Sequence, residues 1–264
     1  SRSIKEIKKE VIAMTGQGTR EIILLGQNVN AYEHNFYEKQ DRLSDLINEI
    51  SKIDMIKRIR YTTSHPNNMT SDLIALHGEN NKLMPFLHLP VQSGSNTILK
   101  KMNRKYTSED YRNIIFELKD KNPKIQISSD FIVGFPGETD KDFNDTLDLV
   151  DDIKFTQSYS FIYSERPGTK ASSIKDETSI FIKKERLKIL QEKLKKIQLE
   201  FNQEHCNKNS KVLIENQSTS NQEYYFGRTP YMQSVYVKSK NLVAGKEIDV
   251  EINSCNHKSL YANF

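Results

Sequence analysis

Residues 125–139 read Ile-Gln-Ile-Ser-Ser-Asp-Phe-Ile-Val-Gly-Phe-Pro-Gly-Glu-Thr, which is the pattern of a strand, a turn and the start of a helix. The first part is rich in β-branched and aromatic residues, as expected of a buried strand. Gly and Pro then interrupt it. Thr139, with Asp142 three residues later, resembles the capping box that opens a helix. This stretch therefore predicts one βα unit.

Apolar runs of the same kind occur four more times, with helical patterns between them. They occupy residues 21–26, 58–63, 86–91 and 158–163. Alternating strands and helices of this length predict an α/β fold, either a right-handed βα barrel or a doubly wound sheet. A helical pattern striped by Ile4, Ile7 and Val11 precedes the first run. A barrel that begins with a helix would lack its first strand.

The last third of the chain has a different pattern. Residues 178–204 predict one long helix, and the apolar period then changes to two. Short strands are predicted at residues 211–216, 224–228, 234–239, 247–253 and 259–264. Five short strands suit a small closed β-barrel, a scaffold that often binds oligonucleotides. We therefore expect a βα part at residues 1–172, a connecting helix at 173–204 and a β-barrel at 205–264.

Composition excludes some classes of protein. The net charge of +4 is weak evidence for nucleic-acid binding, and no apolar run approaches the roughly 20 residues of a membrane helix. No secretory signal opens the chain. Cys206 and Cys255, the only two cysteines, lie too far apart in sequence to indicate a metal-cluster motif or a disulfide framework. We expect a cytoplasmic protein with no membrane contact.

Polar residues follow each of the five predicted strands, where βα barrels carry their reactive groups. Amides and hydroxyls predominate there, which suits a ligand that carries ribose, amino and carboxylate groups. His65 and His88 have a simpler interpretation as packing histidines. The candidate ligand contacts are Gln27, Asn28, Asn30, Ser64, His65, Gln92, Ser93, Ser129, Asp130 and Arg166.

Four segments together carry a resemblance to a known family. They are residues 24–30 (LLGQNVN), 62–66 (TTSHP), 88–95 (HLPVQSGS) and 129–139 (SDFIVGFPGET). They resemble the MiaB-type radical S-adenosylmethionine (radical-SAM) tRNA methylthiotransferases, and the similarity runs through the whole chain. The resemblance implies an α/β fold, namely a partial radical-SAM (βα)6 barrel that here lacks its first strand, followed by a small all-β TRAM barrel.

The resemblance also implies cofactors, partners and a reaction. The family uses S-adenosylmethionine, two 4Fe–4S clusters and an electron donor that reduces them. A deoxyadenosyl radical abstracts hydrogen from C2 of N6-dimethylallyladenosine next to the anticodon of a tRNA, and a methylated sulfur is then inserted. By this resemblance Gln27, Asn28, Gln92 and Ser93 would hold the methionine and ribose ends of S-adenosylmethionine, and residues 130–134 would lie along its adenine. Arg166 would meet a carboxylate or a phosphate.

The chain departs from the family in its cysteines. It has neither the CxxxCxxC loop nor an N-terminal cluster domain, so the cluster ligands are expected upstream of Ser1. We therefore expect no cluster in this chain, no metal ligands and no activity of the chain alone. Other interpretations are a methylthiotransferase for threonylcarbamoyl-adenosine or a ribosomal protein, a non-catalytic RNA-binding remnant, and a metallohydrolase that uses His65 and His88.

The predicted β-barrel offers candidate RNA contacts. Tyr225, Arg228 and Lys238 combine stacking surface with positive charge, as expected for a protein that holds an unpaired RNA loop. Phe226 and Tyr236 have the alternative interpretation of barrel core. We expect a monomer that binds a tRNA anticodon stem-loop.

Overall fold

The computed structural model describes residues 1–36, 39–174, 176, 178–219 and 221–264. Five parallel strands lie side by side in chain order: β1 (Glu21–Leu24), β4 (Arg58–Tyr61), β5 (Phe86–His88), β6 (Gln126–Val133) and β7 (Gln157–Ile162). The β1–β4 pair joins the β5–β6–β7 sheet through Ile59, whose N–H donates to Lys82 O (2.7 Å). Because this order never reverses, the sheet is that of a partial barrel and not of a doubly wound fold.

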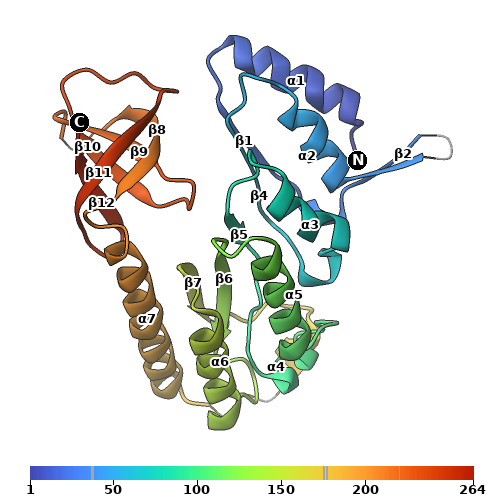
Figure 1. Ribbon diagram of the computed structural model, residues 1–264. Helices are drawn as coiled ribbons and strands as arrows, with labels where there is room; N and C mark the ends of the chain where they lie inside the picture. Colours follow the sequence, from blue (N-terminus) through green and yellow to red (C-terminus); the bar gives the residue numbers. More distant parts are fainter. Residues whose placement is uncertain (37–38, 175, 177, 220) are drawn as a thin grey trace.

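Helices cover one face of this sheet (Figure 1). They are α1 (Ile4–Gly16), α2 (Leu43–Ser51), α3 (Ser71–Glu79), α4 (Asn96–Lys101), α5 (Ser108–Lys121) and α6 (Asp140–Ile153). The predicted capping box at Thr139 with Asp142 is present, and a second one, Thr107 with Asp110, opens α5. Sequence analysis missed the hairpin of β2 (Glu33–Phe36) and β3 (Lys39–Arg42), because its residues lack the apolar alternation of a buried strand. Three 3₁₀ turns, η1 (Val29–Ala31), η2 (Pro66–Asn68) and η3 (Lys170–Ser173), lie in the connecting loops.

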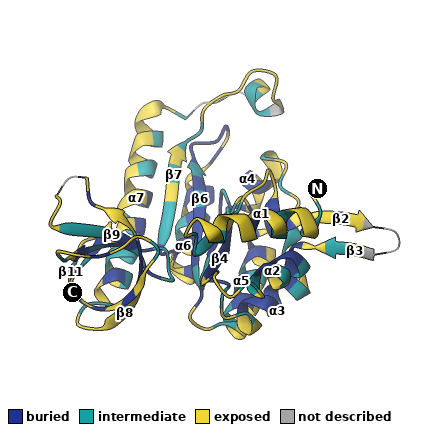
Figure 2. Cartoon of the chain, turned by 90° about the horizontal axis from the view of Figure 1, so that it is seen from above, coloured by how far each residue is buried: buried dark blue, intermediate teal, exposed yellow. Residues whose placement is uncertain are grey.

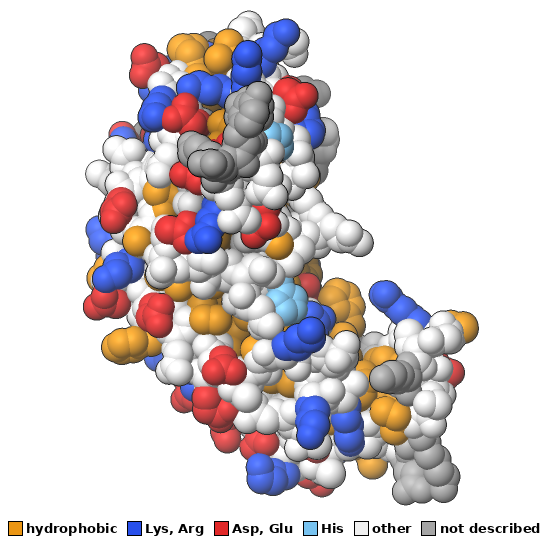
Figure 3. All heavy atoms as spheres, turned by 90° about the vertical axis from the view of Figure 1, so that its right-hand side faces the viewer, with side chains coloured by type: hydrophobic (Ala, Val, Ile, Leu, Met, Phe, Trp, Pro, Cys, Tyr) orange, Lys and Arg blue, Asp and Glu red, His pale blue; other side chains and the backbone are white. Residues whose placement is uncertain are grey.

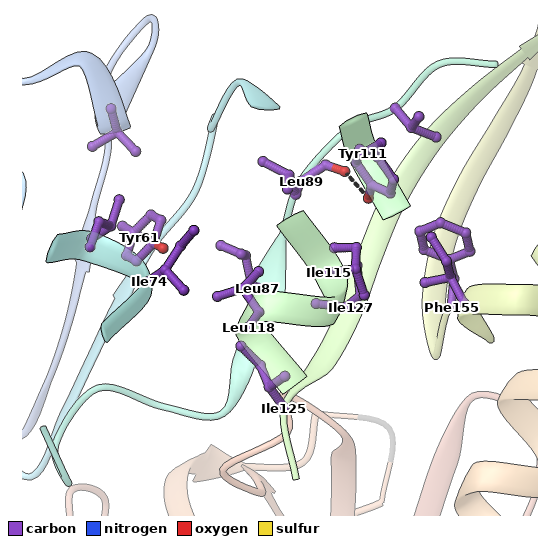
Figure 4. Packing of buried hydrophobic residues seen from close by; sticks show 14 of the residues in the cluster. Tyr61, Ile74, Leu87, Leu89, Tyr111, Ile115, Leu118, Ile125, Ile127 and Phe155 are labelled. Atoms are coloured by element: carbon purple, nitrogen blue, oxygen red, sulfur yellow. Dashed lines mark hydrogen bonds between the residues drawn. The ribbon is translucent and has the colours of Figure 1, made fainter. Parts of the chain in front are cut away.

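The core lies between the sheet and these helices (Figure 4). Leu87, Leu89 and Ile127 from the strands pack against Ile115 and Leu118 of α5. Tyr111 is fully buried within this cluster, and its hydroxyl donates to Leu89 O at 2.7 Å. The sheet is thereby fixed to α5 both by apolar burial and by a satisfied buried hydroxyl.

The long helix α7 (Ile180–Gln203) continues this layer. The apolar side of α7 faces β7, and its Leu190 and Leu194 are buried in the same cluster as the sheet. The opposite side of α7 is exposed, as Figure 2 shows. No helix in the described part of the chain is both long and apolar enough to cross a membrane.

A closed barrel follows α7, and we call it the C-terminal barrel. Its strands are β8 (Asn209–Gln217), β9 (Tyr224–Arg228), β10 (Ser234–Lys238), β11 (Glu247–Cys255) and β12 (Ser259–Asn263), which confirms the five-strand prediction. Its buried cluster is apolar and includes Val212, Val235 and Ile252. Gly227 permits closure, since a Cβ there would lie 2.4 Å from Leu213 O.

Two arginines of β4 join the C-terminal barrel to the sheet, and we call Arg58 and Arg60 the junction arginines. Both are buried, with 1% and 4% of their surface exposed. Arg58 donates to Arg228 O (2.7 Å) and to Glu247 Oε2 (3.0 Å), and Arg60 donates to Pro230 O (2.8 Å). Each also pairs with Glu21 of β1. The C-terminal barrel is therefore held near the amino ends of the strands, away from the loops that follow their carboxyl ends.

Candidate functional site at the carboxyl ends of the strands

The loops that follow the carboxyl ends of β1, β4, β5, β6 and β7 form what we call the rim. The loops after β1 and β4 are joined by Asn30, whose side chain donates to His65 O (2.9 Å) and accepts from His65 N (2.8 Å). Asn30 is itself buried, with 7% exposed. Its amide is therefore occupied in holding the two loops together, although the sequence placed it among the ligand contacts.

Other predicted residues of these two loops remain open. Gln27 is exposed, and the exposed Asn28 amide donates to Asn68 Oδ1 at 2.9 Å. Ser64 is 6% exposed, and its hydroxyl has no hydrogen-bond partner among the described residues. A buried hydroxyl without a partner is rare in a folded protein and indicates a place for a polar ligand or water.

The loop after β5 is tightly constrained. Gln92 has a left-handed backbone (φ 74°), and its N–H donates to Asp130 O at 2.9 Å. A Cβ on Gly94 would lie 2.3 Å from Asp145 O, so only Gly fits. Ser93 is fully buried, and its hydroxyl contacts Thr146 Oγ1 (3.3 Å) and accepts from Ser95 N (3.2 Å). Ser93 thus holds this loop on α6, whereas Gln92 stays partly exposed.

Along β6 the predicted neighbours separate to opposite faces. Ser129 is fully buried and accepts from Val91 N at 2.9 Å, so it supports the β5 loop. Asp130 lies on the other face, with its carboxylate 3.5 Å from His88 Nε2. His88 Nδ1 in turn contacts Ser128 Oγ at 2.9 Å. Because side chains alternate along a strand, Asp130 can contact a ligand, whereas Ser129 points into the core and cannot.

The turn after β6 depends on a buried ion pair that sequence analysis missed. Glu138 accepts from Gly134 N (2.5 Å) and from Arg186 of α7 (3.0 Å). Both side chains are buried, with 1% of Glu138 and 8% of Arg186 exposed. Burial raises the pKa of the Glu138 carboxyl, although the Gly134 N–H and the Arg186 guanidinium act in the opposite direction. Arg186 lies 48 residues after Glu138 in the chain, so the sequence does not show that the two are partners. The one indication in the sequence is that an Arg stands among the apolar positions of a predicted helix.

The strand β7 presents apolar surface next to the rim. Tyr159 and Phe161 are 61% and 56% exposed, and they pair in register with Asp130 and Ile132 of β6. Arg166, in the loop beyond, is exposed, and its side chain makes no hydrogen bond or ion pair with the residues that the structure describes. Figure 3 shows that one side of the molecule is hollowed, with a His and several Lys and Arg side chains near the hollow. A large polar ligand with an aromatic part would suit this combination of groups.

The two rim histidines do not form a metal site. His65 accepts from Asn67 N (3.3 Å) and packs edge-on against Tyr106. Burial, and then the nearby Arg104, lower the pKa of His65. His88 faces Asp130 on a different strand. Among the described residues no three His, Cys, Asp or Glu side chains are grouped to hold a metal ion, and so the metallohydrolase interpretation has no support here.

The C-terminal barrel carries a row of aromatic residues on its outer face. Phe226, Tyr236 and Tyr261 are opposite one another on β9, β10 and β12. Tyr236 stacks on Tyr261 with an interplanar angle of 20°, and Phe226 lies 5.6 Å from Tyr236 between ring centroids. We call these three residues the aromatic row. Val235 and Val237, their neighbours on β10, point into the core.

The predicted RNA contacts are distributed over both sides of this barrel. Arg228 lies beside the aromatic row, 5.1 Å from the Phe226 ring, and pairs with Glu215 at 3.0 Å. Lys238 is exposed and pairs with Glu223 at 3.3 Å. Tyr225 instead packs against the barrel core, opposite Val237. Tyr225, a predicted RNA contact, therefore turns inward, whereas Phe226 and Tyr236, for which barrel core was the alternative interpretation, lie on the outer face.

Comparisons with known proteins find one matching family and several related proteins. Residues 1–150 match the model of the radical SAM superfamily. Over 98% of its length the chain is 51% identical to the tRNA-2-methylthio-N(6)-dimethylallyladenosine synthase of Rickettsia canadensis and 48% identical to that of Wolbachia pipientis. It spans 58% and 59% of the lengths of these two relatives. Coproporphyrinogen III oxidase (HemN) from Escherichia coli, described as a radical SAM enzyme, shares the fold at 14% identity with a TM-score of 0.52, over 87% of this chain and 61% of the other.

Proposed function

We propose that this chain, which belongs to the radical SAM superfamily, is the part of a tRNA methylthiotransferase that holds the substrate and the cofactor. The reaction is methylthiolation at C2 of N6-dimethylallyladenosine next to the anticodon. The observation that carries this proposal is the identity of 51% and 50% to two such synthases over 98% of the chain, which includes the rim and the C-terminal barrel. The protein acts in the cytoplasm as a monomer, together with an electron donor.

The rim fits S-adenosylmethionine. Ser64 offers a buried hydroxyl that lacks a partner, and Gln27, Gln92 and Asp130 offer partly or fully exposed polar side chains on neighbouring loops. These groups would bind the ribose, amino and carboxylate groups, and Arg166 would reach a carboxylate or phosphate. When bound, the cofactor supplies radical chemistry and a methyl group. The work of this chain is to hold and orient it, with Asn30, Ser93 and Ser129 as supports.

An iron–sulfur cluster does not fit the described residues. Such a cluster needs several cysteine thiolates, and both cysteines lie at the C-terminal barrel, remote from the rim. The chain spans 58% of the length of the Rickettsia canadensis synthase, and we expect the chain alone to be inactive.

The C-terminal barrel would hold the RNA. Unpaired bases stack on exposed aromatic rings, and basic side chains contact the phosphates. The aromatic row, with Arg228 at its edge and Lys238 on the neighbouring strand, offers both kinds of contact. Since the barrel is fixed near the amino ends of the strands, a bound loop would extend past Tyr159 and Phe161 to bring its target base to the rim.

A chimera tests the activity. The chain replaces the matching segment of the Rickettsia canadensis synthase, to which it is 51% identical. We expect the chimera to convert dimethylallyladenosine in an anticodon stem-loop to its 2-methylthio product, detected by mass spectrometry of the nucleosides. Conversion of threonylcarbamoyl-adenosine RNA or of a ribosomal protein instead would move the assignment to another branch of the family. A folded chimera that binds RNA but converts none of these substrates would indicate a non-catalytic remnant.

RNA binding is tested on the chain as it stands. Alanine at both Tyr236 and Tyr261 should weaken binding of an anticodon stem-loop by about 1–3 kcal/mol, the range for loss of stacking on one base. Phe116→Ala is the matched control, because Phe116 is an aromatic residue of α5 with 74% of its surface exposed. Equal affinity of the double variant and this control would remove the aromatic row from the RNA interface.

A further inference from the structure

The two cysteines, distant in sequence, are neighbours in the folded chain. Cys206 lies just after α7, and Cys255 ends β11. Two hydrogen bonds bring the segments around them together: Asn202 Nδ2 donates to Asn256 O (2.8 Å), and Asn207 N donates to Ile252 O (2.7 Å). Both side chains pack against the apolar cluster of the C-terminal barrel. The two cysteines can therefore form a pair, although their distance in sequence gave no indication of one.

The surroundings of the two thiols bear on how each would react with an oxidant. Both are free and half-buried, so a small reagent can reach them. The Cys206 sulfur contacts Asn202 O at 3.9 Å. Burial, followed by interaction with the Cys206 thiol, raises the pKa of Cys255 to about 11. Cys255 is thus a poor nucleophile at neutral pH, and we assign the first attack to Cys206.

We propose that Cys206 and Cys255 form a dithiol that a small disulfide oxidant, such as oxidised glutathione, converts into an intramolecular disulfide. The Cys206 thiolate attacks the oxidant, forms a mixed disulfide and releases one glutathione thiolate. Cys255 then loses its proton and attacks the Cys206 sulfur, which releases the second glutathione. The protein dithiol is oxidised by two electrons, and oxidised glutathione is reduced to two thiols. The new bond would tie the end of α7 to the end of β11.

The experiment treats the whole chain with oxidised glutathione at neutral pH. We expect a monomer two hydrogens lighter, with no bound glutathione and with a peptide that joins Cys206 to Cys255 in the mass spectrum. Because the bond closes most of the C-terminal barrel into one loop, oxidation should raise the midpoint temperature of unfolding by several degrees, and dithiothreitol should reverse the rise.

Two single variants make the result decisive. Cys255→Ser should keep one glutathione on Cys206, because the second attack is lost. Cys206→Ser should react more slowly than Cys255→Ser, because burial, the larger cause of the raised pKa of Cys255, remains when Cys206 is replaced. Neither variant should show the rise in midpoint temperature. If the unaltered chain keeps two free thiols, retains glutathione at both sites, or forms only cross-linked dimers, the proposal is wrong. This test does not depend on RNA or cofactor binding.

Discussion

Charged and titratable side chains are buried in and beside the βα part, whereas the buried cluster of the C-terminal barrel is apolar. Glu138 forms a buried pair with Arg186 of α7 beside the rim, and the neutral His77 is enclosed against Tyr61. In the C-terminal barrel, side chains such as Val235 and Leu260 fill the interior, and the aromatic row lies outside. Structural and functional roles thus share the same loops in the first region, whereas strand alternation separates them in the second.

The Arg186–Glu138 pair gives the largest expected effect. Arg186→Ala should lower the free energy of unfolding by about 3–5 kcal/mol, because it leaves the Glu138 carboxyl buried without its partner. Urea denaturation measures the change. Lys188→Ala, on the exposed side of the same helix, should cost well under about 1 kcal/mol. Similar losses for both variants would mean that buried charge does not distinguish the βα part.

The enclosed imidazole of His77 predicts acid sensitivity of the βα part. Burial lowers the pKa of His77 to about 4, so the folded chain keeps it neutral while the unfolded chain protonates it near pH 6.5. Its contribution to stability is full above pH 6.5 and declines as pH falls towards 4. Between pH 7 and pH 5 we expect a loss of about 2 kcal/mol.

His77→Gln should reduce this acid loss, because Gln retains a hydrogen-bonding group for Tyr61 without titrating. His257→Gln is the matched control at a half-buried position in the turn between β11 and β12, and it should leave most of the acid loss in place. Denaturant midpoints measured at several pH values give the comparison. An unchanged pH profile in His77→Gln would show that other groups cause the acid sensitivity.

Arg228 tests the outer face of the C-terminal barrel. Arg228→Ala should weaken stem-loop binding by about 1 kcal/mol, as expected for loss of one charge-assisted contact, and leave thermal unfolding nearly unchanged. Glu215→Gln removes the acidic partner of Arg228 and should strengthen binding, because it frees the guanidinium for phosphate. If both variants weaken binding, the ion pair organises the surface and Arg228 does not contact RNA.

Lys238 gives the smallest expected effect. Lys238→Ala should change affinity by less than about 1 kcal/mol, and the slope of affinity against salt should fall by about one unit. A titration of stem-loop binding from low to high salt measures the slope. Lys188→Ala, far along α7, should leave it unaltered. Equal slopes for all three proteins would place the phosphates on another face.

Much of the fold could be predicted because it rests on local patterns. The five apolar runs of the sheet and the period-two strands of the barrel are confirmed, since burial of one face repeats in the sequence wherever a strand is packed. The phase of β9 could not be assigned, because Tyr224, Tyr225 and Phe226 are all aromatic. Only pairing with the Ser-Val-Tyr-Val-Lys pattern of β10 shows that Tyr225 turns inward.

At the rim, the type of each residue could be predicted from the sequence, whereas its role depends on how the loops pack. The sequence determined that polar side chains gather after the strands, because residue type and strand order are local properties. It could not determine that Asn30, Ser93 and Ser129 are occupied by other loops while Asp130 remains open. Nor could it pair Arg58 with the carbonyl of Arg228, or place Cys206 beside Cys255. These contacts join residues far apart in the chain, and they arise only when packing has fixed the distances between whole elements.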